Sequence, residues 1–155
     1  AILAAGYYTE TGLIALQARE LGIKVPLFGG DGWDSPSLVE VGGKAIEGCY
    51  FSNHFSGVDA APMIQDFLKR YQAKFGGEAD AMAALGYDSM MLLADAMTRA
   101  GTTDGAKVRD ALAGTQTFTG VTGAINLTAD RNANKPAVML EVRGGKFRYV
   151  ETVQP

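Results

Sequence analysis

Short apolar runs alternate with helical segments over the first 53 residues, and this alternation restricts the fold more than any other feature of the sequence. The expected strands are residues 1–5, 25–28 and 48–51. Strands that are joined through helices by connections of a few residues pair in parallel, and the helices cross over the sheet. The sequence therefore predicts the α/β class, and the run 1–5 is interpreted as a buried strand of a parallel sheet.

Two helices are expected between these strands. Apolar residues at helical spacing mark the first helix, at Leu13, Leu16, Ala18 and Leu21. Gly22 ends this helix, and Arg19 suits the negative end of the helix dipole. The second helix begins at Ser35 and Pro36, a capping residue followed by a proline in the first turn.

The rest of the chain predicts helices and then strands. Helices are expected at residues 62–75, 81–100 and 104–112, and strands at 124–127, 137–142 and 147–150. The helix at 81–100 is apolar on almost every side, which predicts burial between other elements. Thr103 is the expected cap of the third helix, and Gly144-Gly145 is the expected turn between the last two strands.

Charge and residue usage argue against several classes of function. The net charge is −3 and the basic residues are scattered among acids, so nucleic acid is not an expected partner. The single cysteine, Cys49, and the single histidine, His54, predict no internal disulfide, no metal site and no catalytic triad. Both are expected to pack or to be solvated. No cofactor is expected, and the chain is not expected to be an enzyme.

The chain opens inside an apolar run, without an initiator methionine or a signal segment. We therefore expect it to be a fragment of a longer protein. Its longest apolar runs, such as Met90–Ala94, fall well short of the roughly 20 residues that span a bilayer.

Asp31 lies among three glycines directly after the second expected strand. Ligands of parallel α/β sheets bind beyond the carboxyl ends of the strands, and the bare backbone at Gly30 would let a ligand approach. The carboxylate could then pair with an ammonium group. It could instead be a turn residue that accepts hydrogen bonds from its own backbone, which is common in glycine-rich loops.

Aromatic residues accompany both strand ends. Trp33, two residues beyond Asp31, could form a pocket wall with its indole N–H in contact with water, or it could pack across a helix N-terminus. Of Tyr7 and Tyr8, one is expected to face the crevice with a free hydroxyl, and the other could simply cover a helix.

Two other patterns were weighed as sites. The glycine-rich loop at 29–32 lacks the dinucleotide fingerprint and the phosphate-binding lysine, and Asp31 would repel a phosphate. Asp88 and Asp95 are spaced to share one face of a helix, but no nucleophile or base accompanies them. Structural or solvated carboxylates are the better interpretation.

The order of short motifs resembles a known family. The motifs are Gly6-Tyr7-Tyr8-Thr9-Glu10-Thr11-Gly12, Gln17-Ala18-Arg19-Glu20-Leu21-Gly22, Phe28-Gly29-Gly30-Asp31-Gly32, Glu47-Gly48, Gly86-Tyr87-Asp88 and Thr122-Gly123-Ala124-Ile125. In this order and spacing they are similar to the type I periplasmic binding proteins of branched-chain amino acid (Leu/Ile/Val) ABC transporters. The resemblance extends over essentially the whole chain.

The resemblance implies two Rossmann-like lobes with parallel sheets and crossover helices, which close on a ligand. Residues 1–53 would begin the C-terminal lobe, 54–135 would return to the N-terminal lobe, and 136–155 would complete the C-terminal lobe. The missing N-terminal half of the protein would carry the groups that bind the ligand's carboxylate.

The resemblance also assigns ligand-binding residues. The family's tyrosine after the first strand falls on Tyr7 rather than Tyr8, and the acid that holds the ligand's α-ammonium falls on Asp31, where relatives often carry Glu. An aromatic residue of the family falls on Met82, so the preference for the ligand's side chain is open here. Trp33 stands where some relatives carry a smaller aliphatic residue, next to the Gly30 backbone.

The implied function is the extracytoplasmic solute-binding component of an ABC importer, located in the periplasm or lipid-anchored in a Gram-positive cell. Its expected partners are a small amino acid and a membrane permease. A ligand-sensing regulatory module of the same fold, or a site for an aromatic acid or an amide, remains an alternative. An enzyme of the flavodoxin or Rossmann type would need a catalytic group that the sequence does not display.

Overall fold

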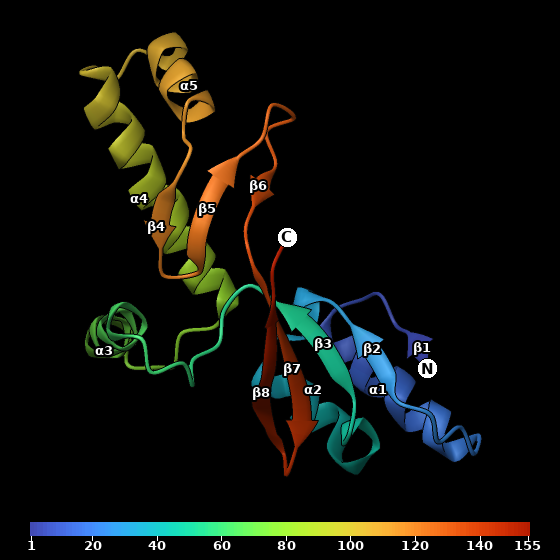
Figure 1. The fold of residues 1–155 in the computed structure, drawn as a ribbon. Coiled ribbons are helices and arrows are strands. Elements are labelled where there is room, and N and C mark those ends of the chain that lie inside the picture. The colour runs from blue at the N-terminus through green and yellow to red at the C-terminus, as the bar shows by residue number, and fades with distance from the viewer. The chain divides into compact units, whose positions relative to one another are not determined.

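The computed structural model describes residues 1–155, and the chain divides into two compact units. Unit 1 consists of Ala1–Val58 and Ala137–Val153, and unit 2 consists of Asp59–Pro136 with the last two residues. Figure 1 labels the helices and strands of both units. None of the helices combines the length and the apolar character that a membrane span requires.

Unit 1 is built on a five-stranded sheet with the order β1-β2-β3-β7-β8 (Figure 1). Its strands are β1 (Ile2–Leu3), β2 (Leu27–Gly29), β3 (Tyr50–Asn53), β7 (Ala137–Arg143) and β8 (Lys146–Val153). The first three pair in parallel, and β7 and β8 join antiparallel. The α/β prediction with a parallel sheet and connecting helices is therefore confirmed for this unit.

Helices α1 (Tyr8–Glu20) and α2 (Pro36–Gly42) connect the parallel strands and pack against each other. Ser35 caps α2 as expected, because its side chain accepts a hydrogen bond from the Ser37 N–H at 3.2 Å. One hydrophobic core joins these helices to the sheet; it contains Ala15, Leu27, Leu38, Phe51 and Val142 among others.

The buried face of α1 differs from the expected one. Leu13, Leu16 and Leu21 are exposed in this chain, whereas Thr11, Gly12, Ala15 and Ala18 are buried. The reason is the close approach of α2: a Cβ on Gly12 would come within 2.8 Å of Val41 Cγ1. Small residues let the helices meet at this distance, so the leucine stripe is not the packing face.

Strand β1 is also less buried than predicted. Ile2 and Leu3 are both exposed, and only Ala4, just past the strand, lies in the core. The strand lies at the edge of the sheet and pairs on one side only, with β2. The exposure of Ile2 and Leu3 is that of this chain, in which β1 pairs on one side only.

The turn between β7 and β8 confirms the expected hairpin. Gly144 and Gly145 have φ angles of 63° and 67°, a region that favours glycine. Both N–H groups of the turn donate to the Glu47 carboxylate, at 2.8 and 2.7 Å. Glu47, which lies between α2 and β3, therefore links this part of the chain to the β7–β8 hairpin.

Unit 2 contains three helices and a small antiparallel sheet. The helices are α3 (Pro62–Phe75), α4 (Ala81–Ala100) and α5 (Gly105–Ala113), and the strands are β4 (Phe118–Gly120), β5 (Gly123–Leu127) and β6 (Ala133–Asn134). The three helices lie where the sequence predicted them, and Gly101 ends α4 with a φ of 65°. The cap of α5 is Asp104, which accepts from the Lys107 N–H, and not the expected Thr103.

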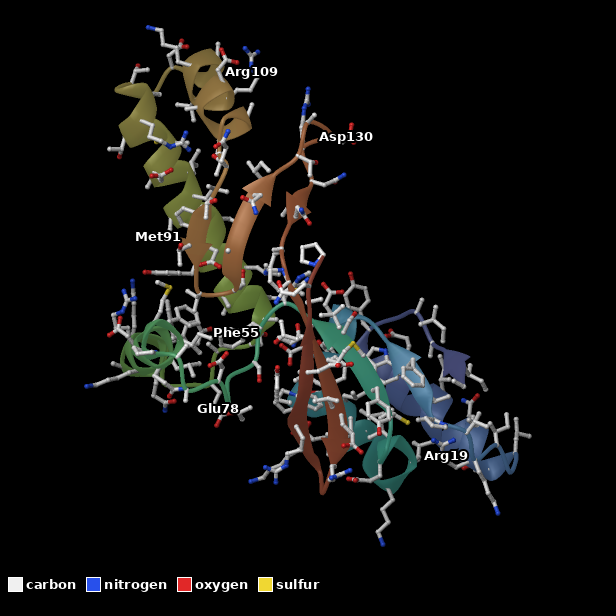
Figure 2. All side chains as sticks on the ribbon, viewed as in Figure 1. Arg19, Phe55, Glu78, Met91, Arg109 and Asp130 are labelled. Carbon is white, nitrogen blue, oxygen red and sulfur yellow. The ribbon has the colours of Figure 1, made fainter.

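Helix α4 is not buried on all sides in this chain. Its buried residues are Ala81, Ala84, Asp88 and Ala96, whereas Met90 and Met91 are exposed. Figure 2 labels Met91 beside α4. Within this chain α4 packs through these small residues, and burial on almost every side is not observed.

Candidate functional site

Three parallel strands end at the same edge of the sheet in unit 1. Because β1, β2 and β3 are neighbours in parallel register, the residues that follow them lie at one edge. These residues are Gly6, Tyr7 and Tyr8 after β1, the loop at residues 30–33 after β2, and His54 after β3. Figure 2 labels Phe55, which follows His54 in the sequence. It also labels Arg19, which lies in the last turn of α1, far along the helix from Tyr8.

Asp31 opens a short 3-10 turn, Asp31–Trp33, that follows β2. Its carboxylate is about half exposed (48%), and Oδ2 lies 3.2 Å from His54 Nε2. The hydrogen bond of this carboxylate therefore goes to a side chain from the next strand and not to its own backbone. A cation approaching from solvent would meet a negative group that is held from one side only.

The glycines of the loop leave room around Asp31. A Cβ on Gly30 would meet no atom within 4 Å, so the backbone there borders open space. Gly32 has the opposite role: a Cβ there would come within 2.8 Å of the Gly6 carbonyl oxygen and 3.1 Å of the Tyr7 ring. The loops after β1 and β2 therefore touch, and Tyr7 lies next to the Asp31 turn.

Tyr7 and Tyr8 occupy the start of α1. Tyr7 precedes the helix with an extended backbone and is largely exposed (70%), whereas Tyr8 is the first helical residue and is less exposed. Tyr7 is thus the tyrosine whose ring borders the Asp31 turn and is open to solvent. The choice of Tyr7 over Tyr8 as a ligand contact stays a prediction.

Trp33 does not have the expected pocket-wall position. It is fully buried in the core, its ring lies 6.0 Å from that of Phe51, and its Nε1–H donates to the Ala4 carbonyl at 3.2 Å. A Cβ on Gly29 would overlap the indole ring, so the loop folds directly over it. The expectation of an indole N–H in contact with water is wrong, and the alternative, packing, is what the structure displays.

Met82 belongs to unit 2, where it lies in the first turn of α4 and is about half exposed. A separate cavity of about 480 Å³ in this unit is lined by aromatic and basic side chains of α3 and α4, among them Phe67, Arg70 and Tyr87. Ala83 borders this cavity, but Met82 does not.

His54 is the residue that the sequence analysis missed. It was expected only to pack or to be solvated, because a lone histidine gives no motif. The signal that could have found it is topological: it follows the third parallel strand, and the strand order places it beside the loop that holds Asp31. Its imidazole is the partner of the one carboxylate at this edge for which an ammonium ligand was expected.

The chemistry of this edge suits the binding of a cation. It holds a carboxylate, an imidazole, a phenol and an open stretch of backbone. No group of three or more His, Cys, Asp or Glu side chains is arranged to hold a metal ion. A small guest with an ammonium group could pair with Asp31 and contact the Tyr7 ring.

Comparison with known proteins places this geometry in a family. A family model described as "Periplasmic binding protein" matches residues 1–146. The chain belongs to the periplasmic binding protein family. Its α/β fold matches that of type I members, although this chain covers only part of a complete binding protein.

Several binding proteins are similar to the chain. A Leu/Ile/Val-binding protein homolog 2 of Brucella abortus is 31% identical over 152 residues, which are 94% of this chain and 40% of that relative. A leucine binding protein of Thermotoga maritima is 38% identical with a TM-score of 0.90, covering 99% of this chain and 44% of that one. The isoleucine complex of a branched-chain amino acid transporter substrate binding protein from Streptococcus pneumoniae is also 38% identical, with a TM-score of 0.86 and the same coverage.

This periplasmic binding protein chain spans less than half the length of these relatives. Periplasmic binding proteins bind solutes for transport, so the family is not an enzyme class.

Proposed function

We propose that the chain is part of an extracytoplasmic solute-binding protein that captures a small aliphatic amino acid and delivers it to an ABC permease. Unit 1 would belong to the C-terminal lobe and unit 2 to the N-terminal lobe. The observation that carries the proposal is the half-exposed Asp31 carboxylate at the carboxyl edge of a parallel sheet, beside the open backbone of Gly30.

The proposed mechanism is capture without chemistry. Asp31 pairs with the ligand's α-ammonium, and Tyr7 and the Gly30 backbone border the ligand. Met82 is a further proposed contact, to the ligand's side chain, and this assignment rests on the resemblance alone. The α-carboxylate would be held by groups of the protein outside this chain.

A charge-assisted hydrogen bond explains why an acid suits this position. Such a bond contributes about 1.5–3 kcal/mol to binding, because one partner is ionised and the pair is partly withdrawn from water. Two features favour an amine over a phosphate or a neutral solute: the negative charge of Asp31 and the lack of a lysine or arginine in the loops at residues 6–8 and 29–33.

The first test is calorimetry on the full-length protein with leucine, isoleucine, valine and alanine. We expect Asp31→Asn, which keeps the shape and removes the charge, to weaken binding of the preferred amino acid about 10- to 150-fold. The matched control is Asp95→Asn, which removes one negative charge from an exposed i,i+4 pair with Arg99 in unit 2. Unchanged affinity in Asp31→Asn would remove this residue from the site.

A further inference from the structure

The ring of His54 and the carboxylate of Asp31 form a pair that connects two strand ends. His54 follows β3 and Asp31 follows β2, and the atoms Nε2 and Oδ2 are 3.2 Å apart. His54 is about a third exposed and Asp31 about half exposed, so both groups can exchange protons with solvent. The backbone N–H of His54 is itself fixed by the Asn53 side chain at 2.8 Å, which steadies the start of this loop.

The hydrogen bond determines which ring nitrogen carries the proton in the neutral imidazole. A carboxylate can only accept, so Nε2 must carry the proton in the neutral ring. A second proton then arrives at Nδ1 and converts the ring to a cation. The same contact is therefore a neutral hydrogen bond when His54 is neutral and an ion pair when His54 is protonated.

Several ionisable groups lie in the loops at the same sheet edge as His54. The loops at this edge carry Asp31 and Asp34 after β2 and Tyr7 and Tyr8 after β1, and the first turn of α1 adds Glu10. On the other side of β3, the register places uncharged residues of β7 beside this end of the strand, with Val138 opposite Asn53. Asp31 contacts the ring directly, with Oδ2 at 3.2 Å from Nε2.

We propose that His54 sets the pH range over which this site binds a cationic guest. When His54 is neutral, it positions the Asp31 carboxylate and leaves the negative charge to the ligand's ammonium. When His54 is protonated, the imidazolium neutralises that charge and repels the ammonium. This inference rests on the proposed function, because it concerns the same carboxylate.

The direction of the pH effect follows from linkage. A ligand cation bound at Asp31 disfavours the protonated ring, so binding releases a proton from His54 and affinity falls as the pH falls. Imidazoles ordinarily titrate near pH 6.5, within the range that an extracytoplasmic protein meets. The amine of a free amino acid stays cationic through this range, and Asp carboxyls ordinarily titrate well below it.

The experiment is a pH series of calorimetric titrations with leucine on the full-length protein. We expect the dissociation constant of the wild-type protein to rise up to about ten-fold between about pH 7.5 and pH 5.5. His54→Gln retains an amide donor but no titrating group, so its affinity should not vary over this range. Asp95→Asn should keep the wild-type profile.

A second measurement uses the wild-type protein alone and therefore does not require that a variant folds. The titration midpoint of the His54 ring, followed by NMR in the wild-type protein, should move to lower pH when leucine is bound. A midpoint that does not move, or equal pH profiles in wild type and His54→Gln, would overturn the role of His54 while leaving amino acid binding intact. Absence of binding of leucine, isoleucine, valine and alanine at about pH 7.5 would instead overturn the proposed function, and this inference with it.

Discussion

The surroundings of a carboxylate decide its role, and Asp31 and Asp88 have opposite surroundings. Asp88 is buried (2% exposed) and accepts from the Val121 N–H, the Thr122 N–H and the Thr122 hydroxyl, at 2.7–2.8 Å. A Cβ on Gly120 would collide with this carboxylate, so the β4–β5 turn is fitted around it. Asp88 is thus structural, whereas the Asp31 carboxylate keeps one side exposed to solvent.

We expect Asp88→Ala to lower the free energy of unfolding by about 2–4 kcal/mol, because it leaves buried backbone and hydroxyl donors without an acceptor. Denaturant titration measures this change. Asp95→Ala, which breaks only an exposed ion pair with Arg99 on the same helix, should cost less than about 1 kcal/mol. Equal losses in the two variants would contradict the structural role of Asp88.

For single residues, the sequence was enough to identify candidates for the site, but it was not enough to predict what surrounds each of them in the fold. The loop with Asp31 could be found because a carboxylate among glycines after a strand is visible in the sequence. The burial of Trp33 and the contact between His54 and Asp31 could not, because both depend on which loops meet across neighbouring strands. Local sequence carries no information about such contacts.

Among the helices and strands, α1 shows what apolar periodicity can and cannot predict. Its existence was predicted from apolar spacing, but its buried face is the one with Thr11, Gly12, Ala15 and Ala18. Apolar spacing predicts which face of a helix is buried when the surface against which the helix packs is not known. Here α1 packs closely against α2. The small volume of the side chains on one face of α1, and not their hydrophobicity, therefore decides which face is buried.

The contact between α1 and α2 gives a matched pair of glycine substitutions. In a helix interior, Gly→Ala normally stabilises by up to about 1 kcal/mol. Gly86 in α4 has no atom within 4 Å of an added Cβ, so Gly86→Ala should raise the free energy of unfolding. Gly12→Ala should lower it, because the new methyl group would press on Val41 and on the Gly42 backbone. Thermal unfolding of both variants tests this, and stabilisation by Gly12→Ala would mean that the helices lie further apart.

For the whole molecule, ligand binding and stability are linked. A ligand that binds only the folded protein adds about 2.7 kcal/mol of stability at a concentration of 100 times its dissociation constant. We therefore expect leucine, isoleucine or valine to raise the melting temperature of the full-length protein by several degrees. Asp31→Asn should lose most of this increase at the same ligand concentration, and an increase equal to that of the wild type would argue against Asp31 as a ligand contact.

The β3–β7 pairing also fixes the order in which unit 1 can be assembled on the ribosome. The edge of β3 at Tyr50–Asn53 can pair with β7 only after β7 has been synthesised. Strand β7 begins at Ala137, so the whole of the 59–136 segment is made first. At about 5–20 residues per second, the sheet spends several seconds of translation with this edge uncovered. The nascent chain therefore presents a strand that can pair with the wrong partner, and a holding chaperone would be most useful during this interval.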